Sequence, residues 1–268
     1  MNRRRAEMLK EMGLTPVWRL RDAAADMKPS QGEDLVAAQT EPGLPGDRSP
    51  PAMAVQTVAA RAPGVLPAAD RRSQIMQMDW DALKACVAGC IACPLHATRT
   101  NTVFGVGDER ADWLFVGEGP GAEEDARGEP FVGQAGRLLD NMLAAIKLKR
   151  GRNVYIANIL KCRPPGNRNP APEEALACEP HLHRQIELIR PKLIVALGRV
   201  AALNLLARDT SIASLRGQVH QYRGIPLIVT YHPAYLLRTL PDKAKAWVDL
   251  RFAVETMKGL QNQPAATR

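Results

Sequence analysis

The stretch GEGPGAEEDARGEPFVGQAG, residues 117–136, decides how this sequence is organised. The apolar run WLFV at 113–116 precedes it and is typical of a short buried strand, and RLLDNML at 137–143 follows with apolar positions at helical spacing. Connections from a strand to a helix ordinarily take about 2–6 residues, and much longer ones are usually functional or disordered. The sequence therefore predicts a functional loop here. The alternative is an acidic surface loop without a function.

The composition is that of a folded, basic protein. At 268 residues with 46% hydrophobic content, the chain is long enough for one large domain or two small ones. It has no run of about 18 apolar residues and no apolar leader near its start, so we expect a cytoplasmic protein without a membrane partner. The net charge is +8, and residues 141–172 contain seven basic and no acidic side chains. This one-sign segment favours a polyanionic partner over a merely solvated surface.

Three regions follow from the changes in composition. Residues 1–25 predict an amphipathic appendage. Residues 26–74 are rich in proline and alanine and have no Phe, Trp, Tyr or Ile, so they cannot bury enough apolar surface to offset the entropy of ordering. We expect a disordered linker there. The folded domain is predicted over residues 75–262.

Within that domain, apolar strand patterns alternate with helical patterns. The predicted strands are 113–116, 154–160, 193–197 and 226–231, and the predicted helices are 135–147, 172–189, 199–207 and 242–257. A further helix is expected around 79–84, and 216–222 is a candidate for a short extra strand. Alternation of this kind predicts an α/β fold with three layers, α/β/α, around a central, mainly parallel, four-stranded sheet.

Ligands of such sheets bind outside the carboxyl ends of the strands. Four conspicuous features lie at or near those ends: the loop at 117–136, Asn158, Gly198 and the pair His232-Pro233. Their order along the chain predicts a single site.

Five cysteines are present. In a cytoplasmic chain structural disulfides are rare, which leaves metal binding or simple burial. Cys90 and Cys93 form a CxxC pair, and Cys162 and Cys178 form a second, widely spaced pair. Four thiolates suit either tetrahedral zinc or an iron–sulfur cluster, and the wide second spacing favours a [4Fe–4S] cluster. Cys86 is interpreted as a small buried hydrophobic residue, with a role as a spare ligand left open.

Four motifs occur together in a characteristic order: CxxCPL at 90–95, the loop at 117–136, NILKCRPP at 158–165 with its later cysteine, and YHPAY at 231–235. In this combination the chain resembles the family 4 uracil-DNA glycosylases, the iron–sulfur-containing branch, over about residues 78–260. The resemblance implies the fold of that family and hydrolysis of the N-glycosidic bond of deoxyuridine in DNA. It also implies that Cys90, Cys93, Cys162 and Cys178 hold the cluster.

The resemblance further implies a pocket for an extruded uracil. Phe131 is the only aromatic residue in the long loop and would stack on the base, while backbone around Gly119 and Gly121 would line the pocket. The planar amide of Asn158 can pair with the O4 and N3 edge of uracil, which cytosine does not match. His232 resembles the histidine that donates a hydrogen bond to O2 as negative charge develops on the leaving base.

The residue that activates water is less clearly indicated. Classical uracil glycosylases carry an aspartate in the first loop, where this sequence has Gly119. The neighbouring carboxylates Glu118, Glu124 and Asp125 are the candidates. Leu236 or Leu237 is expected to wedge into the duplex. Arg163 and Arg238 are expected to contact phosphates.

Three other functions fit the sequence less well. A dinucleotide site is rejected because Pro120 and three consecutive acidic residues oppose a pyrophosphate. An iron–sulfur electron carrier would leave Asn158, Phe131 and the YHPAY segment unexplained. A covalent or non-catalytic uracil-DNA-binding relative would be expected to carry a histidine after Cys162, where the sequence reads RPPGNRNP. The prediction is therefore a monomeric, monofunctional uracil-DNA glycosylase acting on single- or double-stranded DNA, with a structural cluster.

Overall fold

The computed structural model describes residues 68–262. The predicted appendage at 1–25, and the predicted linker as far as residue 67, lie outside the described residues. The last part of that linker prediction is wrong, because Ala68–Ile75 forms a helix, α2. Its Ile75 is buried, and Arg71 and Arg72 bond to a later helix. Composition missed α2 because a single apolar anchor and two arginines hold it.

The centre of the fold is a six-stranded sheet of order β1-β3-β2-β4-β6-β5. The four middle strands are parallel: β3 (Val154–Asn158), β2 (Trp113–Gly117), β4 (Leu193–Leu197) and β6 (Ile225–Thr230). The short edge strands β1 (Val106–Gly107) and β5 (His220–Tyr222) are antiparallel. The parallel four-stranded centre is confirmed. The prediction missed β1, which is too short to have a pattern.

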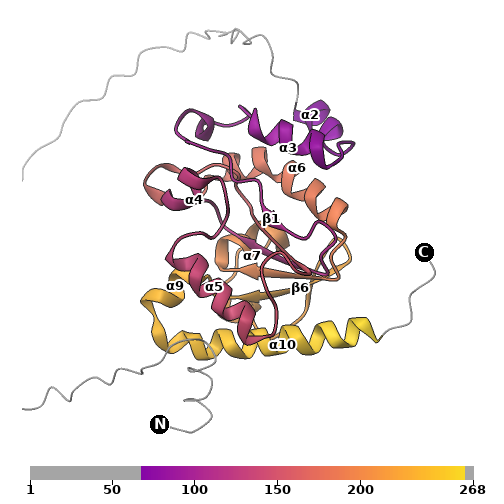
Figure 1. The fold of residues 1–268 in the computed structure, drawn as a ribbon, viewed down its shortest axis with the longest axis vertical. Helices are drawn as coiled ribbons and strands as arrows, with labels where there is room; N and C mark the ends of the chain where they lie inside the picture. Colours follow the sequence, from indigo (N-terminus) through magenta and orange to yellow (C-terminus); the bar gives the residue numbers. More distant parts are fainter. Residues whose placement is uncertain (1–67, 263–268) are drawn as a thin grey trace, which may run out of the picture. The chain divides into compact units, whose positions relative to one another are not determined.

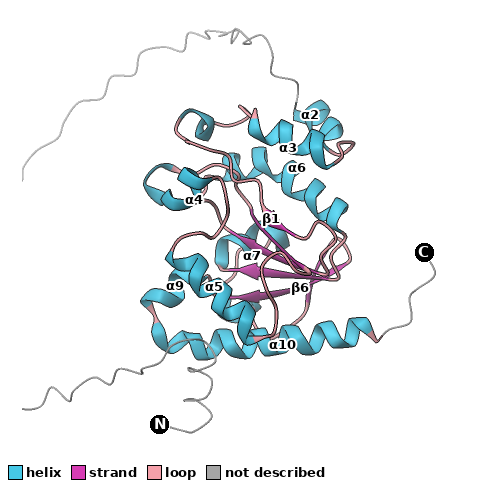
Figure 2. Cartoon of the chain, in the orientation of Figure 1, coloured by secondary structure: helices cyan, strands magenta, loops and turns pink. Residues whose placement is uncertain are grey.

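Helices cover both faces of the sheet, so the three-layer prediction is confirmed (Figures 1 and 2). On β2, Trp113 and Phe115 enter one core and Leu114 and Val116 the other, as expected for a strand buried on both faces. The first core is shared with α5 (Gln134–Ala145), α9 (Pro233–Arg238) and α10 (Lys243–Gln261). The second is shared with α6 (Pro172–Ile189) and α7 (Arg199–Leu206).

The remaining elements are short, except for α3 at Trp80–Ala88, which packs with α2 against α6 (Figure 1). They are α4 (Ala122–Arg127), α8 (Ile212–Leu215) and three 3-10 turns, η1 (Pro94–Ala97), η2 (Pro165–Asn167) and η3 (Leu240–Asp242). None of the helices in residues 68–262 is long and apolar enough to cross a membrane.

The loop at 117–136 is folded back on the carboxyl end of β2 and contains α4. Two of its glycines allow this close packing. A Cβ atom on Gly117 would lie 2.5 Å from both Asn158 Oδ1 and the ring of Phe131. A Cβ atom on Gly136 would lie 1.7 Å from the carbonyl oxygen of Phe131. Phe131 itself has φ 55°, so the chain turns sharply where the ring enters the site. These contacts explain why the stretch is rich in glycine.

Candidate active site

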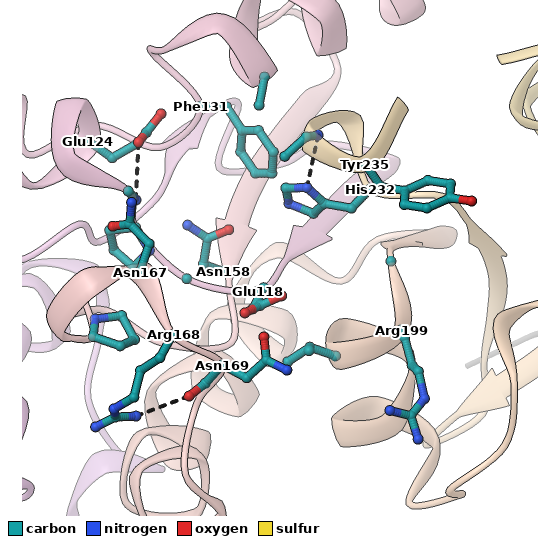
Figure 3. A pocket seen from close by; sticks show the side chains of 18 of the residues that line it. Glu118, Glu124, Phe131, Asn158, Asn167, Arg168, Asn169, Arg199, His232 and Tyr235 are labelled. Atoms are coloured by element: carbon teal, nitrogen blue, oxygen red, sulfur yellow. Dashed lines mark hydrogen bonds between the residues drawn. The ribbon is translucent and has the colours of Figure 1, made fainter. Parts of the chain in front are cut away.

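A cavity of about 730 Å³ opens at the carboxyl ends of the parallel strands, where the sequence predicted a site (Figure 3). Its volume is in the range of pockets that take nucleoside-sized ligands. Eight of the predicted residues line it: Glu118, Gly119, Gly121, Glu124, Phe131, Asn158, His232 and Arg238. They come from three segments that are far apart in the sequence, and Gly198, the fourth predicted feature, also lines the cavity, so the predicted convergence is found.

Asn158 ends β3 and lies at the base of the cavity. Only 1% of the residue is exposed, and neither Nδ2 nor Oδ1 has a hydrogen-bond partner among the described residues. A buried amide without partners costs roughly 1–3 kcal/mol, so native folds rarely keep one without a reason. The amide is held by its surroundings with both polar atoms available to a ligand.

Two rings meet above this amide (Figure 3). The centroids of Phe131 and His232 are 5.6 Å apart and their planes are inclined by 32°. Phe131 is 6% exposed, because the loop packs its ring into the core of the α5 face. The amide and the two rings bound a slot suited to a flat, polar heterocycle.

The protonation of His232 follows from its place at the start of α9. Its Nδ1 accepts a hydrogen bond from the backbone N–H of Ala234 at 3.1 Å, so the neutral ring carries its proton on Nε2. Burial, and then the charge of Arg238, lower the pKa of His232 to about 4, against a smaller opposing effect of Glu124. At neutral pH the side chain is an uncharged Nε2–H donor.

The three candidate carboxylates have different surroundings. Glu124 accepts hydrogen bonds from the backbone amides of Gly121 at 3.1 Å and of Val132 and Gly133, each at 3.0 Å. It therefore fixes the two ends of the loop against each other. Glu118 lines the cavity with no side-chain hydrogen bond to the described residues, and burial raises the pKa of its carboxyl group.

Asp125 does not line the cavity. Its side chain is 4% exposed and accepts from the backbone amides of Thr100 and Asn101. Because these bonds direct the carboxylate toward another loop, the prediction that Asp125 is a catalytic group is not supported. Of the three carboxylates, Glu118 is the one that lines the cavity without a hydrogen bond from its side chain to the described residues.

The four predicted DNA-contacting residues differ in their exposure and in their position relative to the cavity. Leu236 is fully buried in the α5-face core, so the expectation that it could act as a wedge is wrong. Leu237 is 38% exposed at the end of α9, and Arg238 lines the cavity. Arg163 donates from Nε to Asn167 Oδ1 at 2.7 Å and lies outside the cavity lining.

Several residues of the cavity were missed from the sequence. Asn167, Arg168 and Asn169 form part of its rim, and Arg199 lies at its edge after β4. Arg168 donates to both oxygens of the buried Glu174, at 2.8 and 2.6 Å, which pins the rim to α6. The absence of acidic residues from 141 to 172 was the available signal for this basic rim, but it did not indicate which arginine would face the cavity.

The four predicted cysteines lie together beside the segment that follows β3. Cys90, Cys93, Cys162 and Cys178 line one small cavity of about 10 Å³, together with Arg99, Lys161 and His181. Cys86 is not part of this lining; its sulfur is 3.8 Å from His181 Nε2. Residues 68–262 contain no group of three His, Cys, Asp or Glu side chains placed to hold a metal ion. The arrangement therefore does not form a compact site for one zinc ion.

The surroundings of the sulfurs suit an anionic group. Arg99 Nη1 donates to Cys162 Sγ at 3.1 Å, and the backbone N–H of Lys161 donates to Cys178 Sγ at 3.2 Å. Within the described residues neither Arg99 nor Lys161 forms an ion pair with a carboxylate. Burial raises the pKa of Cys178 to about 12, so the thiol keeps its proton unless a metal replaces it. A cubane cluster spaces four thiolates further apart than a single ion does, and this donor set fits one.

Comparison with known proteins agrees with the fold and the cavity. The uracil DNA glycosylase superfamily profile matches residues 104–251. The chain is 50% identical over 159 residues to a type-4 uracil-DNA glycosylase of Archaeoglobus fulgidus, covering 56% of this chain and 79% of the relative. It is 46% identical over 176 residues to that of Thermotoga maritima, covering 65% and 89%. A type-5 uracil-DNA glycosylase of Thermus thermophilus is 31% identical over 195 residues, covering 58% and 87%.

The chain therefore belongs to the uracil DNA glycosylase superfamily and, within it, to the type-4 family. Membership makes it a DNA N-glycosylase, a hydrolase.

Proposed function

We propose that the protein hydrolyses the N-glycosidic bond of deoxyuridine in DNA, releasing uracil and leaving an abasic site. The observation that carries this proposal is the buried amide of Asn158, which has no hydrogen-bond partner within residues 68–262 and faces the slot between Phe131 and His232. A base inside a duplex cannot reach such a slot, so the nucleotide must rotate out of the stack.

Recognition of uracil follows from the amide. Its N–H donates to uracil O4 and its carbonyl oxygen accepts from uracil N3–H. Cytosine offers an amino group in place of O4 and an acceptor in place of N3–H, which would leave buried polar groups unpaired. Such a mismatch gives discrimination of roughly 10⁴–10⁵-fold where a site is built around the hydrogen bonds.

The leaving group is stabilised by His232. As the glycosidic bond breaks, negative charge develops on the base, and the Nε2–H group donates to uracil O2. Because Ala234 occupies Nδ1, the donor points at the slot without reorganisation. One preorganised donor of this kind is worth roughly 10²–10³ in rate.

The attacking water is assigned to Glu118. Its carboxylate lines the cavity and is not committed to the backbone, whereas Glu124 holds the loop. The ionised form of Glu118 can orient water and stabilise the positive charge that develops on the sugar. The cavity lining contains no lysine among the described residues, so no amine is positioned to form a Schiff base with the sugar. This supports a monofunctional reaction.

DNA binding is assigned to the rim, where Arg168, Arg199 and Arg238 are exposed or border the cavity. Contacts of this kind go to phosphates and carry no base sequence information. We further propose that the protein acts as a monomer in the cytoplasm, on single- or double-stranded DNA.

The cofactor is proposed to be a [4Fe–4S] cluster held by Cys90, Cys93, Cys162 and Cys178. When bound, it supplies four iron–thiolate bonds, which tie the CxxC segment to the segment after β3 and to α6. No electron transfer is needed for hydrolysis, so its role is structural. Arg99 and Lys161 place positive charge beside the sulfurs.

The test uses labelled single- and double-stranded oligonucleotides with one uracil, cytosine or thymine at a fixed position. Uracil-containing strands are expected to break at that position only after alkali, and the other strands are expected to stay intact. Intact uracil strands with cluster-loaded protein would refute the proposal. A covalent protein–DNA adduct in place of free uracil would identify a uracil-trapping relative.

A further inference from the structure

The helix α2 contributes to none of the motifs in the sequence, yet it lies against the element that carries Cys178. In Figure 1, α2 lies beside α3 and α6, and both α2 and α3 contact α6. The buried side chain of Ile75 anchors its end. The turn after α2 is also fixed, since Arg184 Nε on α6 donates to the carbonyl oxygen of Met78 at 2.6 Å.

Arg71 extends from α2 to the cysteine cavity. Its Nη2 donates to Cys90 Sγ at 3.6 Å, and its Nη1 donates to the carbonyl oxygen of Ala177 at 2.9 Å. Nη2 also lies 3.2 Å from Nε2 of the fully buried His181. The Arg71 side chain therefore contacts Cys90 of the first cysteine pair. It also contacts α6, the helix that carries Cys178, at the preceding residue Ala177.

The charge of Arg71 has no carboxylate partner among the described residues. A cation that is partly buried without an ion pair is costly, and folds usually compensate it with an anion. Arg99 and Lys161 also line this cavity without a carboxylate partner among the described residues. Three unpaired cations around four neutral thiols are unbalanced, and an anionic metal–thiolate group balances them.

We propose that α2 clamps the iron–sulfur cluster and that Arg71 stabilises it, by donating to a cluster thiolate and by joining the CxxC segment to α6. This proposal rests on the cluster assigned above. Arg71 is a positioning residue; it touches no reacting atom. Hydrogen bonds and positive charge at the sulfurs stabilise the more reduced state, so Arg71 also raises the reduction potential of the cluster.

The neighbouring Arg72 supplies a matched control. It comes from the same turn of α2 and also binds α6, but it pairs with Glu179, and its Nη2 lies 3.0 Å from His183 Nδ1. Within residues 68–262 it has no bond to a sulfur. Arg72→Met loosens the docking of α2 while leaving the charge at the cluster. Arg71→Met removes that charge, and Arg71→Lys keeps it.

The experiment compares the full-length wild-type protein and these three variants after anaerobic purification. Iron and sulfide per chain are measured first. The visible absorbance of the cluster is then followed under excess chelator and oxygen, and the reduction potential is measured by titration. Arg71→Met is expected to lose its cluster roughly five-fold faster, the factor expected from one ordinary net hydrogen bond, and to show a lower potential. Arg71→Lys should fall between it and the wild type, and Arg72→Met should keep the wild-type potential.

Cluster loss and potential unchanged in Arg71→Met would overturn the clamp while leaving the proposed function intact, provided uracil release is normal. Equal shifts in Arg71→Met and Arg72→Met would also overturn it, because docking of α2 alone would then explain both. Wild-type protein without iron and sulfide would refute the cofactor assignment and the clamp together.

Discussion

The two cavities of this protein are built on the same short segment and differ in almost every property. Asn158 ends β3 at the larger cavity, and Lys161 and Cys162 follow at the smaller one. The larger, of about 730 Å³, leaves the Asn158 amide without a hydrogen-bond partner in the described part of the chain. The smaller, of about 10 Å³, surrounds its sulfurs with donors from Arg71, Arg99 and the Lys161 amide.

This difference indicates which groups meet a substrate. Amide atoms that a fold buries and leaves unpaired are kept for an exchangeable ligand, whereas sulfurs that the fold surrounds with hydrogen-bond donors are arranged to hold a permanent one. The same rule separates Glu118 from Glu124 inside the larger cavity. Substitutions at these residues test that distinction.

The largest effect is expected at Asn158. In Asn158→Ala the kcat/KM for uracil-containing DNA should fall by at least roughly 10²–10³-fold, because the donor and acceptor that read the base are both lost. Cluster absorbance should be unchanged, because the cysteine cavity is untouched. Oligonucleotide cleavage measures the first and visible absorbance the second. The control is Asn204→Ala, which removes an exposed asparagine on α7. Near-normal cleavage by Asn158→Ala would contradict the claim that the unpaired amide of Asn158 binds the substrate.

Glu118→Gln should lower kcat by roughly 10–100-fold with little change in KM, since Glu118 acts on water rather than on binding. Burial raises the pKa of Glu118 above its ordinary value of 4.5, and the ionised form is the active one. Activity should therefore fall as pH drops through that raised pKa, and Glu118→Gln should lack this acidic limb. Glu123→Gln, the matched control on α4, should keep it. An unchanged pH profile in Glu118→Gln would remove Glu118 from the mechanism.

Lys161 joins the two cavities. Its fully buried Nζ donates to the carbonyl oxygen of Asn158 at 3.0 Å and to Gln185 Oε1 at 2.6 Å. Lys161→Met should lower the free energy of unfolding by about 2 kcal/mol, because two buried acceptors lose their donor. Lys243→Met is the control: Lys243 is 3% exposed and its side-chain Nζ has no hydrogen-bond partner among the described residues, so its loss should be neutral or stabilising. Chemical denaturation of the cluster-loaded proteins measures both free energies of unfolding. Equal decreases in Lys161→Met and Lys243→Met would contradict the claim that the two hydrogen bonds of Lys161 stabilise the fold.

The smallest effect on activity is expected at Leu237. Leu237→Ala should slow cleavage several-fold on duplex DNA and leave single-stranded DNA unaffected, because only a duplex has a gap to fill. Leu236→Ala should instead cost about 2–5 kcal/mol of stability, as loss of a buried leucine does. Steady-state rates on both substrates and denaturation curves distinguish the two. A duplex-specific defect in Leu236→Ala but not in Leu237→Ala would instead indicate that Leu236 is the residue that wedges into the duplex.

Much of the fold was predictable because its strands are buried on both faces and read as plain apolar runs. The helix at 172–189 was predicted at its observed bounds, with Pro172 at its start. β1 was missed because two residues carry no pattern. α2 was missed because arginine contacts and Ile75 hold it, whereas composition registers only the scarcity of apolar residues.

The position of a site residue was predictable where its motif is distinctive, as for Asn158 and His232 at the larger cavity and the four cysteines at the smaller one, and the chemical roles of these residues stay predictions. The choice among the three carboxylates was not predictable, because neighbours in sequence point in different directions: Asp125 bonds to the loop at Thr100, and Glu124 bonds across its own loop. Leu236 and Leu237 have the same side chain, and only the packing of α9 buries one and exposes the other.

The central claim is that one cavity performs the hydrolysis and the other holds the cluster. It is tested most directly by measuring free uracil released, together with iron and sulfide per chain, in the same samples of wild type, Asn158→Ala and Cys162→Ala. The account predicts repeated turnover and a full cluster in the wild type, a full cluster with uracil release at least roughly 10²–10³-fold slower in Asn158→Ala, and loss of iron and sulfide in Cys162→Ala. Wild-type release of uracil by Asn158→Ala, or a full cluster in Cys162→Ala, would contradict it.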